Sequence, residues 1–228
     1  MGLSHSPRIV TNGLVLCLDA ANPKSYPGSG TTWTDMSGLG NNGTLTNGPT
    51  YSSNNAGSIV FDGGDDYVGV TTSSTLGKSL NYTTLAWVRY SNVGYTSWMM
   101  ICDSVDYGSG GGYMMWLDST SPATGKKLCS YDGNWQYANI LIPPNVWTHV
   151  SISKTNNQVS FYVNGIFDVT LTYNFNSNLS STNVDIGNSS RNSYPFNGSI
   201  SNVQIYNRAL SAAEVSQNFN ALRGRFGI

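Results

Sequence analysis

Short apolar or alternating segments, separated by Gly, Asn, Ser and Pro, recur along the whole chain. Such a pattern is typical of antiparallel strands joined by turns. The predicted strands cover residues 14–18, 58–62, 67–70, 84–90, 98–103, 113–117, 127–131, 146–154, 159–163, 167–172, 184–187 and 200–206. We therefore predict an all-β domain in which antiparallel sheets form a sandwich.

The clearest local signal in the chain is a hairpin at Asn164-Gly165. Two apolar runs flank this dipeptide, and Asn-Gly readily supplies the two positive φ angles of a tight hairpin turn. A second hairpin is predicted around Asn156-Asn157.

A single helix is predicted near the C-terminus. Ser211 and Glu214 have the spacing of a capping box, in which each side chain accepts a hydrogen bond from the other residue's backbone. Val215, Phe219 and Leu222 then follow at spacings of four and three, which gives the helix one apolar stripe. The chain's only glutamate, Glu214, is thus assigned a structural role.

The domain organisation is simple. Residues 22–57 are rich in Gly, Ser, Asn and Thr and are predicted to form loops with one short strand at 44–46. No internal repeat or linker divides the chain, so we predict one domain over residues 13–228. Residues 1–12 precede it as a short polar arm, which lacks the basic and apolar regions of a signal peptide.

Charge and composition exclude several classes of partner. Only 10% of residues are charged, the net charge is −1, and no basic run exceeds Lys126-Lys127. Nucleic-acid binding needs a clustered basic surface, which this chain does not encode. The longest apolar stretches have about six residues, whereas about 20 are needed to span a bilayer.

The cysteines Cys17, Cys102 and Cys129 lack metal-ligand spacing. We therefore expect free buried thiols and assembly in a reducing cytoplasm.

The supply of catalytic residues is poor. Because Glu214 is the only glutamate, any mechanism that needs two glutamates is excluded. Asp65 and Asp66 are adjacent on the chain and would point to opposite faces of a strand. Asp103 with Asp106 is the other candidate pair for general acid and base chemistry. The chain has no Gly-x-Ser-x-Gly motif and only two histidines, so we expect no enzymatic activity.

Candidate carbohydrate-binding residues gather around residues 131–137. Aromatic rings can stack on the C–H faces of sugars, and Asn and Asp side chains can bind sugar hydroxyls. The predicted site consists of Trp116, Asp132, Asn134, Trp135 and Tyr137, with the last two residues in an exposed turn.

Other aromatic residues are assigned differently. Tyr95, Trp98 and Tyr107 form a second candidate cluster, whereas Trp87 and Trp147 are predicted to be buried in the core. A sandwich of this size buries many aromatic side chains, so each ring also has a purely structural interpretation.

A metal site is the remaining alternative. Asp62, Asp65 and Asp66 place oxygen ligands beside two glycines, a combination that suits Ca²⁺. No glutamate closes this segment as in an EF-hand. In the competing interpretation the three aspartates are turn residues. No cofactor is therefore required by the sequence, and Ca²⁺ stays an open alternative.

A series of motifs carries a family resemblance. Its members are GLVLCLDA (13–20), WTDMSGLGNNGT (33–44), SIVFDGGDDYV (58–68), WTHV (147–150), FYVNG (161–165) and FNGSISNVQIYNRALSAAEV (196–215). Together they resemble the laminin-G-like branch of the concanavalin A-like lectin/glucanase superfamily, in the form encoded by tailed bacteriophages. The resemblance implies a two-sheet antiparallel jelly-roll sandwich.

The same resemblance bears on chemistry. The glucanases of the superfamily carry a Glu-x-Asp-x-x-Glu strand, which is absent from this chain. Some relatives bind Ca²⁺, but close relatives often have Asp where this chain has Ser201-Asn202. That departure argues against carrying a metal site over.

The functional expectation combines the resemblance with the missing catalytic acids. We expect a non-catalytic, virion-associated structural or binding module, as a capsid decoration or a tail appendage, that binds surface carbohydrate. Its partners would be other virion proteins, a cell-surface glycan or further copies of the chain, and its location the virion. The alternatives are a free-standing lectin and a divergent polysaccharide hydrolase.

Overall fold

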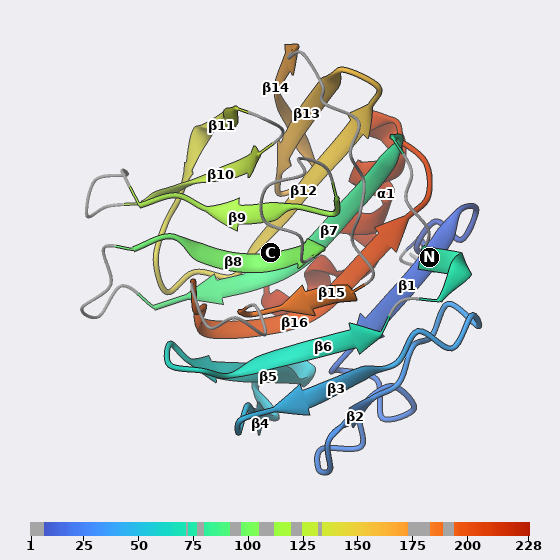
Figure 1. Ribbon diagram of the computed structural model, residues 1–228, viewed down its shortest axis with the longest axis vertical. Coiled ribbons are helices and arrows are strands. Elements are labelled where there is room, and N and C mark those ends of the chain that lie inside the picture. Colours follow the sequence, from blue (N-terminus) through green and yellow to red (C-terminus); the bar gives the residue numbers. More distant parts are fainter. Residues whose placement is uncertain are drawn as a thin grey trace, which may run out of the picture.

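Two antiparallel sheets pack face to face in the computed structural model, which describes residues 7–71, 73–76, 80–91, 97–104, 112–119, 125–131, 134–172, 183–188 and 194–228. Figure 1 shows the two layers, with β8, β15, β6 and β3 lying in front of β7, β12 and β16. The predicted all-β sandwich is confirmed.

Sheet A has the strand order β14-β13-β12-β7-β16-β5-β4, and β1 also pairs with β16. Its strands are β1 (Leu14–Asp19), β4 (Thr50–Ser52), β5 (Ser58–Asp62), β7 (Tyr82–Tyr90), β12 (Thr148–Thr155), β13 (Gln158–Val163), β14 (Ile166–Thr172) and β16 (Asn197–Tyr206). Sheet B has the order β11-β10-β9-β8-β15-β6-β3-β2. Its strands are β2 (Thr32–Trp33), β3 (Gly43–Thr46), β6 (Tyr67–Thr71), β8 (Met99–Ser104), β9 (Met115–Leu117), β10 (Lys126–Tyr131), β11 (Trp135–Ile142) and β15 (Asn183–Ile186).

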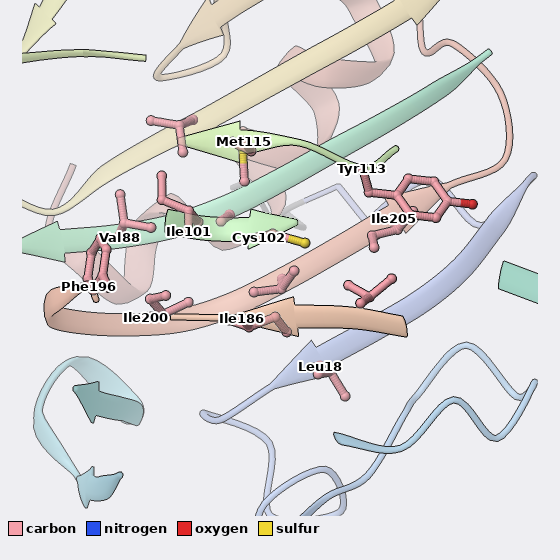
Figure 2. Packing of buried hydrophobic residues seen from close by; sticks show 14 of the residues in the cluster. Leu18, Val88, Ile101, Cys102, Tyr113, Met115, Ile186, Phe196, Ile200 and Ile205 are labelled. Carbon is pink, nitrogen blue, oxygen red and sulfur yellow. The ribbon is translucent and has the colours of Figure 1, made fainter. Parts of the chain in front are cut away.

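The main hydrophobic core fills the space between the two sheets. Successive strand residues point to opposite faces, so alternate side chains of each strand enter this space. Figure 2 shows Ile101 and Met115 of sheet B facing the same interior as Val88 and Ile200 of sheet A. All four side chains are fully buried. The predicted buried thiols are also confirmed, because all three cysteines are free and buried.

Hairpin turns set the pairing within sheet A. Asn164 and Gly165 have φ angles of 52° and 73°, which confirms the predicted turn between β13 and β14. Asn156, with φ of 40°, begins the turn between β12 and β13. A Cβ at Gly165 would lie only 2.7 Å from the Cβ of Phe219, so glycine also allows the hairpin to approach the C-terminal helix.

That helix, α1 (Ala212–Leu222), covers the outer face of sheet A, with the short 3-10 helix η3 (Arg223–Phe226) after it. Ser211 and Glu214 form the predicted capping box. Trp87 stacks with Phe226 at a centroid distance of 4.0 Å. Trp87 is fully buried, as predicted, but between sheet A and the helix instead of inside the sandwich. Two further 3-10 helices are η1 (Asn54–Ala56) and η2 (Ser74–Leu76).

The segment that precedes β1 lies against α1. The backbone N–H of Val10 donates to Oδ1 of Asn218 at 2.7 Å, and Nε2 of Gln217 donates to the carbonyl of Arg8 at 2.7 Å. The predicted arm therefore packs against α1 at Arg8 and Val10, and residues 1–6 lie outside the described residues.

Three strands of the described residues were not predicted, namely β2, β4 and β11. The omission of β11 matters most, because we assigned its first residues to a turn. Its second half reads Asn-Ile-Leu-Ile (139–142), so three apolar residues follow one another and the polar and apolar alternation that marks a strand is missing there. In the described part of the chain, no helix is long and apolar enough to cross a membrane.

Candidate aromatic binding site

The outer face of sheet B, which points away from the core, carries a group of aromatic side chains. Three side chains form its floor, namely Met100, Trp116 and Cys129, and each is at most 1% exposed. Half-buried rings pack above and beside this floor. We call the following rings the aromatic cluster: Trp98, Trp116, Tyr131, Trp135, Tyr137 and Tyr194.

Strand alternation explains why these residues face outward. On β9, Met115 and Leu117 enter the core, so Trp116 between them must point to the other face. The register then aligns neighbours on that face, because Cys129 of β10 pairs with both Trp116 and Tyr137.

Ring geometry makes the cluster continuous. The indoles of Trp98 and Trp135 stack with centroids 4.1 Å apart and an interplanar angle of 29°. Trp135 also contacts Tyr131 at 5.1 Å, and Trp116 contacts Tyr194 at 4.7 Å. Because Trp98, Trp135, Tyr137 and their neighbours remain half-buried while Trp116 is 1% exposed, Trp116 is the base of the cluster and the others form its accessible rim.

A buried carboxyl group lies beside the base of the cluster. Nε1–H of Trp116 donates a hydrogen bond to Oδ2 of Asp103 at 3.0 Å. Asp103 is 5% exposed, and its Oδ1 has no hydrogen-bond partner. Burial, together with the charge of Asp185, raises the pKa of Asp103 well above its usual value. The site thus combines apolar rings with one desolvated acidic group.

The structure brings most of the predicted carbohydrate site together. Trp116, Trp135 and Tyr137 share the aromatic cluster, and exposed Asn134 directly precedes β11. Asp132 lies outside the described residues. The prediction that Trp135 and Tyr137 sit in a turn is wrong, because both belong to β11 and pair with β10.

Two members of the cluster were not assigned to it from the sequence. Trp98 was grouped with Tyr95 and Tyr107, which both lie outside the described residues, but its ring stacks on Trp135. Tyr194 was not considered at all. The alternation of β8 could have indicated the outward face for Met100, but no sequence signal says that β8, β9 and β10 are neighbours.

The candidate metal segment behaves as a turn. Oδ1 of Asp62 accepts from the backbone N–H of Gly64 at 2.6 Å, and Oδ2 of Asp66 accepts from the N–H of Asp62 at 3.0 Å. The backbone carbonyl of Asp65 accepts from Nδ2 of Asn47. Among the described residues, no group of three or more His, Cys, Asp or Glu side chains is placed to hold a metal ion.

Two other titratable residues with shifted pKa values, Glu214 and His149, interact with residues outside the aromatic cluster. Glu214 accepts hydrogen bonds from Arg208 and Ser211, and these contacts lower its pKa to about 2. His149 is buried against Trp87 and Phe219, and desolvation lowers its pKa to about 3. Neither group lies in the aromatic cluster.

Solved structures with the same fold include binding domains of larger proteins. Domain 4 of AbnA, a GH43 extracellular arabinanase from Geobacillus stearothermophilus, is similar over 94% of this chain and 99% of that domain, with 18% identity and a TM-score of 0.68. The binding domain of botulinum neurotoxin DC is similar over 93% of this chain, with 16% identity and a TM-score of 0.70. A structure concerning botulinum neurotoxin type C gives 16% identity over 93% of this chain and a TM-score of 0.66. This chain covers 52% of each toxin chain.

Sequence comparison gives the family. No curated protein sequence matches this chain. A family described as the concanavalin A-like lectin/glucanases superfamily matches residues 62–216, which include strands of both sheets and the start of α1. The chain belongs to the concanavalin A-like lectin/glucanases superfamily.

Proposed function

We propose that this protein is a non-catalytic module that binds carbohydrate through the aromatic cluster of sheet B. The proposal rests on one observation: Trp98, Trp135 and Tyr137 lie together as half-buried rings above a fully buried base. Aromatic rings that remain accessible offer a flat apolar surface to the C–H face of a sugar, and their polar edges reach hydroxyl groups.

Known complexes of similar structures support a binding role. The AbnA domain was solved with arabinotriose, and the work on botulinum neurotoxin type C describes interaction with two ganglioside molecules. The neurotoxin DC domain was solved with rat synaptotagmin II, so the fold itself is compatible with both sugar and protein ligands. The aromatic cluster favours sugar for this chain.

The proposal requires no metal or other cofactor. Stacking and hydroxyl contacts at the cluster use only side chains of this chain, and the carboxylates of Asp62 and Asp66 bind backbone N–H groups of their own turn. The binding test is therefore carried out both with and without Ca²⁺.

The proposed setting is the particle of a tailed bacteriophage. The motif series at residues 13–68 and 147–215 supports this part of the proposal, through its resemblance to proteins of such phages. The partners would be other capsid or tail proteins, surface glycans and further copies of the chain. Mass spectrometry of purified particles tests this setting, since absence of the protein from particles would leave a free-standing lectin.

The binding test is a glycan array with and without Ca²⁺, followed by calorimetry on any glycan that binds. Trp135→Ala should abolish or strongly weaken binding. The matched control is Phe167→Ala, which removes an exposed aromatic ring that packs on Tyr162 of sheet A. Equal affinity of Trp135→Ala and the unaltered protein would refute the site, and no hit on a broad array would refute the sugar ligand. Release of products from a bound polysaccharide would contradict the non-catalytic assignment.

A further inference from the structure

Tyr194 enters the aromatic cluster from outside the strands of sheet B. Its backbone carbonyl accepts a hydrogen bond from the N–H of Met100 on β8 at 3.0 Å, so this residue lies beside β8. Trp135 begins β11, and the order β11-β10-β9-β8 puts the backbones of β11 and β8 about 14 Å apart. The two rings therefore reach the cluster from distant parts of the sheet.

Trp116 is the base that Tyr194 and Trp135 share. Its ring centroid lies 4.7 Å from that of Tyr194 and 5.7 Å from that of Trp135. Within the described part of the chain, no ring contact joins Tyr194 directly to Trp135, whereas Trp98 stacks on Trp135 at 4.1 Å. Trp98 and Trp135 thus form one accessible pair, and half-buried Tyr194 is a separate accessible ring on the same base.

The backbone around Tyr194 is held by several contacts. Oδ1 of Asn188, a fully buried side chain, accepts from the N–H of Tyr194 at 3.2 Å. Pro195 follows, and a proline restricts the backbone of the residue before it. The N–H of Phe196 then donates to the carbonyl of Gly187 at 2.6 Å, and the Phe196 ring is buried in the main core. Tyr194 is therefore positioned before any ligand binds, which lowers the entropic cost of binding.

We propose that Tyr194 forms a second stacking subsite, separate from that of Trp98 and Trp135, so that the site binds an oligosaccharide of two or more sugar residues. The inference rests on the proposed function, because it names the class of glycan that the same site binds. A single sugar ring stacks either on the indole pair or on Tyr194, whereas a longer glycan contacts both and passes over Trp116 between them. Because the two contacts are linked, the second forms at a high effective concentration and adds affinity. Asn188 is the positioning residue of this subsite.

The length dependence of binding tests the second subsite. The glycan found on the array is compared, by calorimetry on the intact protein, with its fragments of one to four sugar residues. Affinity of the unaltered protein should rise at least about tenfold from the monosaccharide to the longest fragment. A monosaccharide that shows no binding beside a longer fragment that binds also meets this expectation. A smaller rise would overturn the proposal.

Substitution of the rings assigns the rise to its cause. Tyr194→Ala should remove the rise with length, so that the longest fragment binds about tenfold more weakly than to the unaltered protein. Trp135→Ala should weaken binding of every fragment. The matched control is Tyr51→Ala, because Tyr51 is also half-buried and packs on one aromatic ring, that of Tyr26 at 5.4 Å, but belongs to sheet A. It should leave all affinities unchanged. A rise that survives in Tyr194→Ala would contradict the second subsite.

The role of Asn188 is tested through Tyr194. Asn188→Ala should weaken binding of the longest fragment, and the double variant should bind no more weakly than Tyr194→Ala, because both substitutions act on one contact. Asn188→Asp keeps an oxygen that accepts from the N–H of Tyr194 and should recover part of the lost affinity. Near-ultraviolet circular dichroism of the ligand-free proteins should change in the same direction in Asn188→Ala and Tyr194→Ala. Additive losses of affinity in the double variant would show that Asn188 does not act through this ring.

The outcomes separate this inference from the proposed function. If neither the array nor any fragment shows binding to the unaltered protein, the proposed function fails, and the second subsite fails with it. If the protein binds a glycan but affinity does not depend on the number of sugar residues, the second subsite fails and the proposed function stands.

Discussion

The two outer faces of the sandwich use tryptophan in opposite ways. On sheet A, Trp87 and Trp147 are covered by Phe219 and Phe226 of the C-terminal segment, and all four side chains are buried. On sheet B, rings of the aromatic cluster pack on one another, and among the described residues all of them except Trp116 remain half-buried. The elements that cover an outer strand face thus decide whether an aromatic residue there is buried in packing or remains accessible to a ligand.

The two outer faces also differ in the contacts made by their buried titratable residues. His149, beneath α1, is held neutral by burial alone, since desolvation is the cause of its lowered pKa. Asp103, beside the base of the aromatic cluster, accepts a hydrogen bond from a ring and has a second acid opposite. Burial on the covered face therefore contributes to the stability of the fold. The acid of the other face is instead hydrogen-bonded to a ring of the surface that is proposed to bind a ligand.

The largest expected effect is on the covered face. Trp87→Ala removes a fully buried indole and its stacking on Phe226, so the free energy of unfolding should fall by about 3–5 kcal/mol. Chemical denaturation followed by circular dichroism measures the loss. A decrease below about 1 kcal/mol would mean that the C-terminal segment is not part of the cooperative fold.

The next effect is the pH dependence contributed by His149. Its pKa is about 3 in the folded protein and near 6.5 when unfolded, so the unfolded chain binds more protons between these values. The contribution of neutral His149 to the free energy of unfolding is therefore fully present above pH 6.5. It is lost as the pH falls towards 3, and the loss amounts to about 2 kcal/mol between pH 6.5 and about pH 5. Denaturation curves at both pH values should show this loss in the unaltered protein and a smaller one in His149→Gln.

On the open face, Trp98→Ala should separate binding from stability. The ring is half-buried and stacks on Trp135, so its removal should lower glycan affinity about tenfold or more, equivalent to about 1.4 kcal/mol. The free energy of unfolding should change less than in Trp87→Ala. Equal destabilisation by the two substitutions would show that both faces serve packing alone.

The smallest expected effect is at the start of α1. Ser211→Ala removes the side chain that caps the helix, and should lower the free energy of unfolding by about 1 kcal/mol. The matched control is Ser53→Ala, because Ser53 precedes η1 and makes no side-chain capping bond. Thermal unfolding of both variants tests whether the cover of sheet A depends on this cap.

Local sequence signals predicted much of the fold correctly. The Asn164-Gly165 turn and the Ser211 and Glu214 capping box are both present, because each depends on neighbouring residues alone. Strand β11 was missed, since the apolar residues Ile140, Leu141 and Ile142 follow one another in its second half and interrupt the alternation. The prediction of Trp135 and Tyr137 as site residues gave the right neighbourhood with the wrong local structure.

The sequence by itself determined the elements whose causes are local, namely the strands with clear alternation, the hairpin turns and the capped helix. It also determined the shortage of glutamate, whose one copy, Glu214, caps a helix. Only the tertiary structure decided which tryptophans are covered and which are half-exposed, and that Trp98 stacks on Trp135 while Asp103 accepts a hydrogen bond from Trp116. The physical reason is that strand alternation assigns a side chain to a face, but the pairing order of distant strands and the packing of α1 decide what lies on that face.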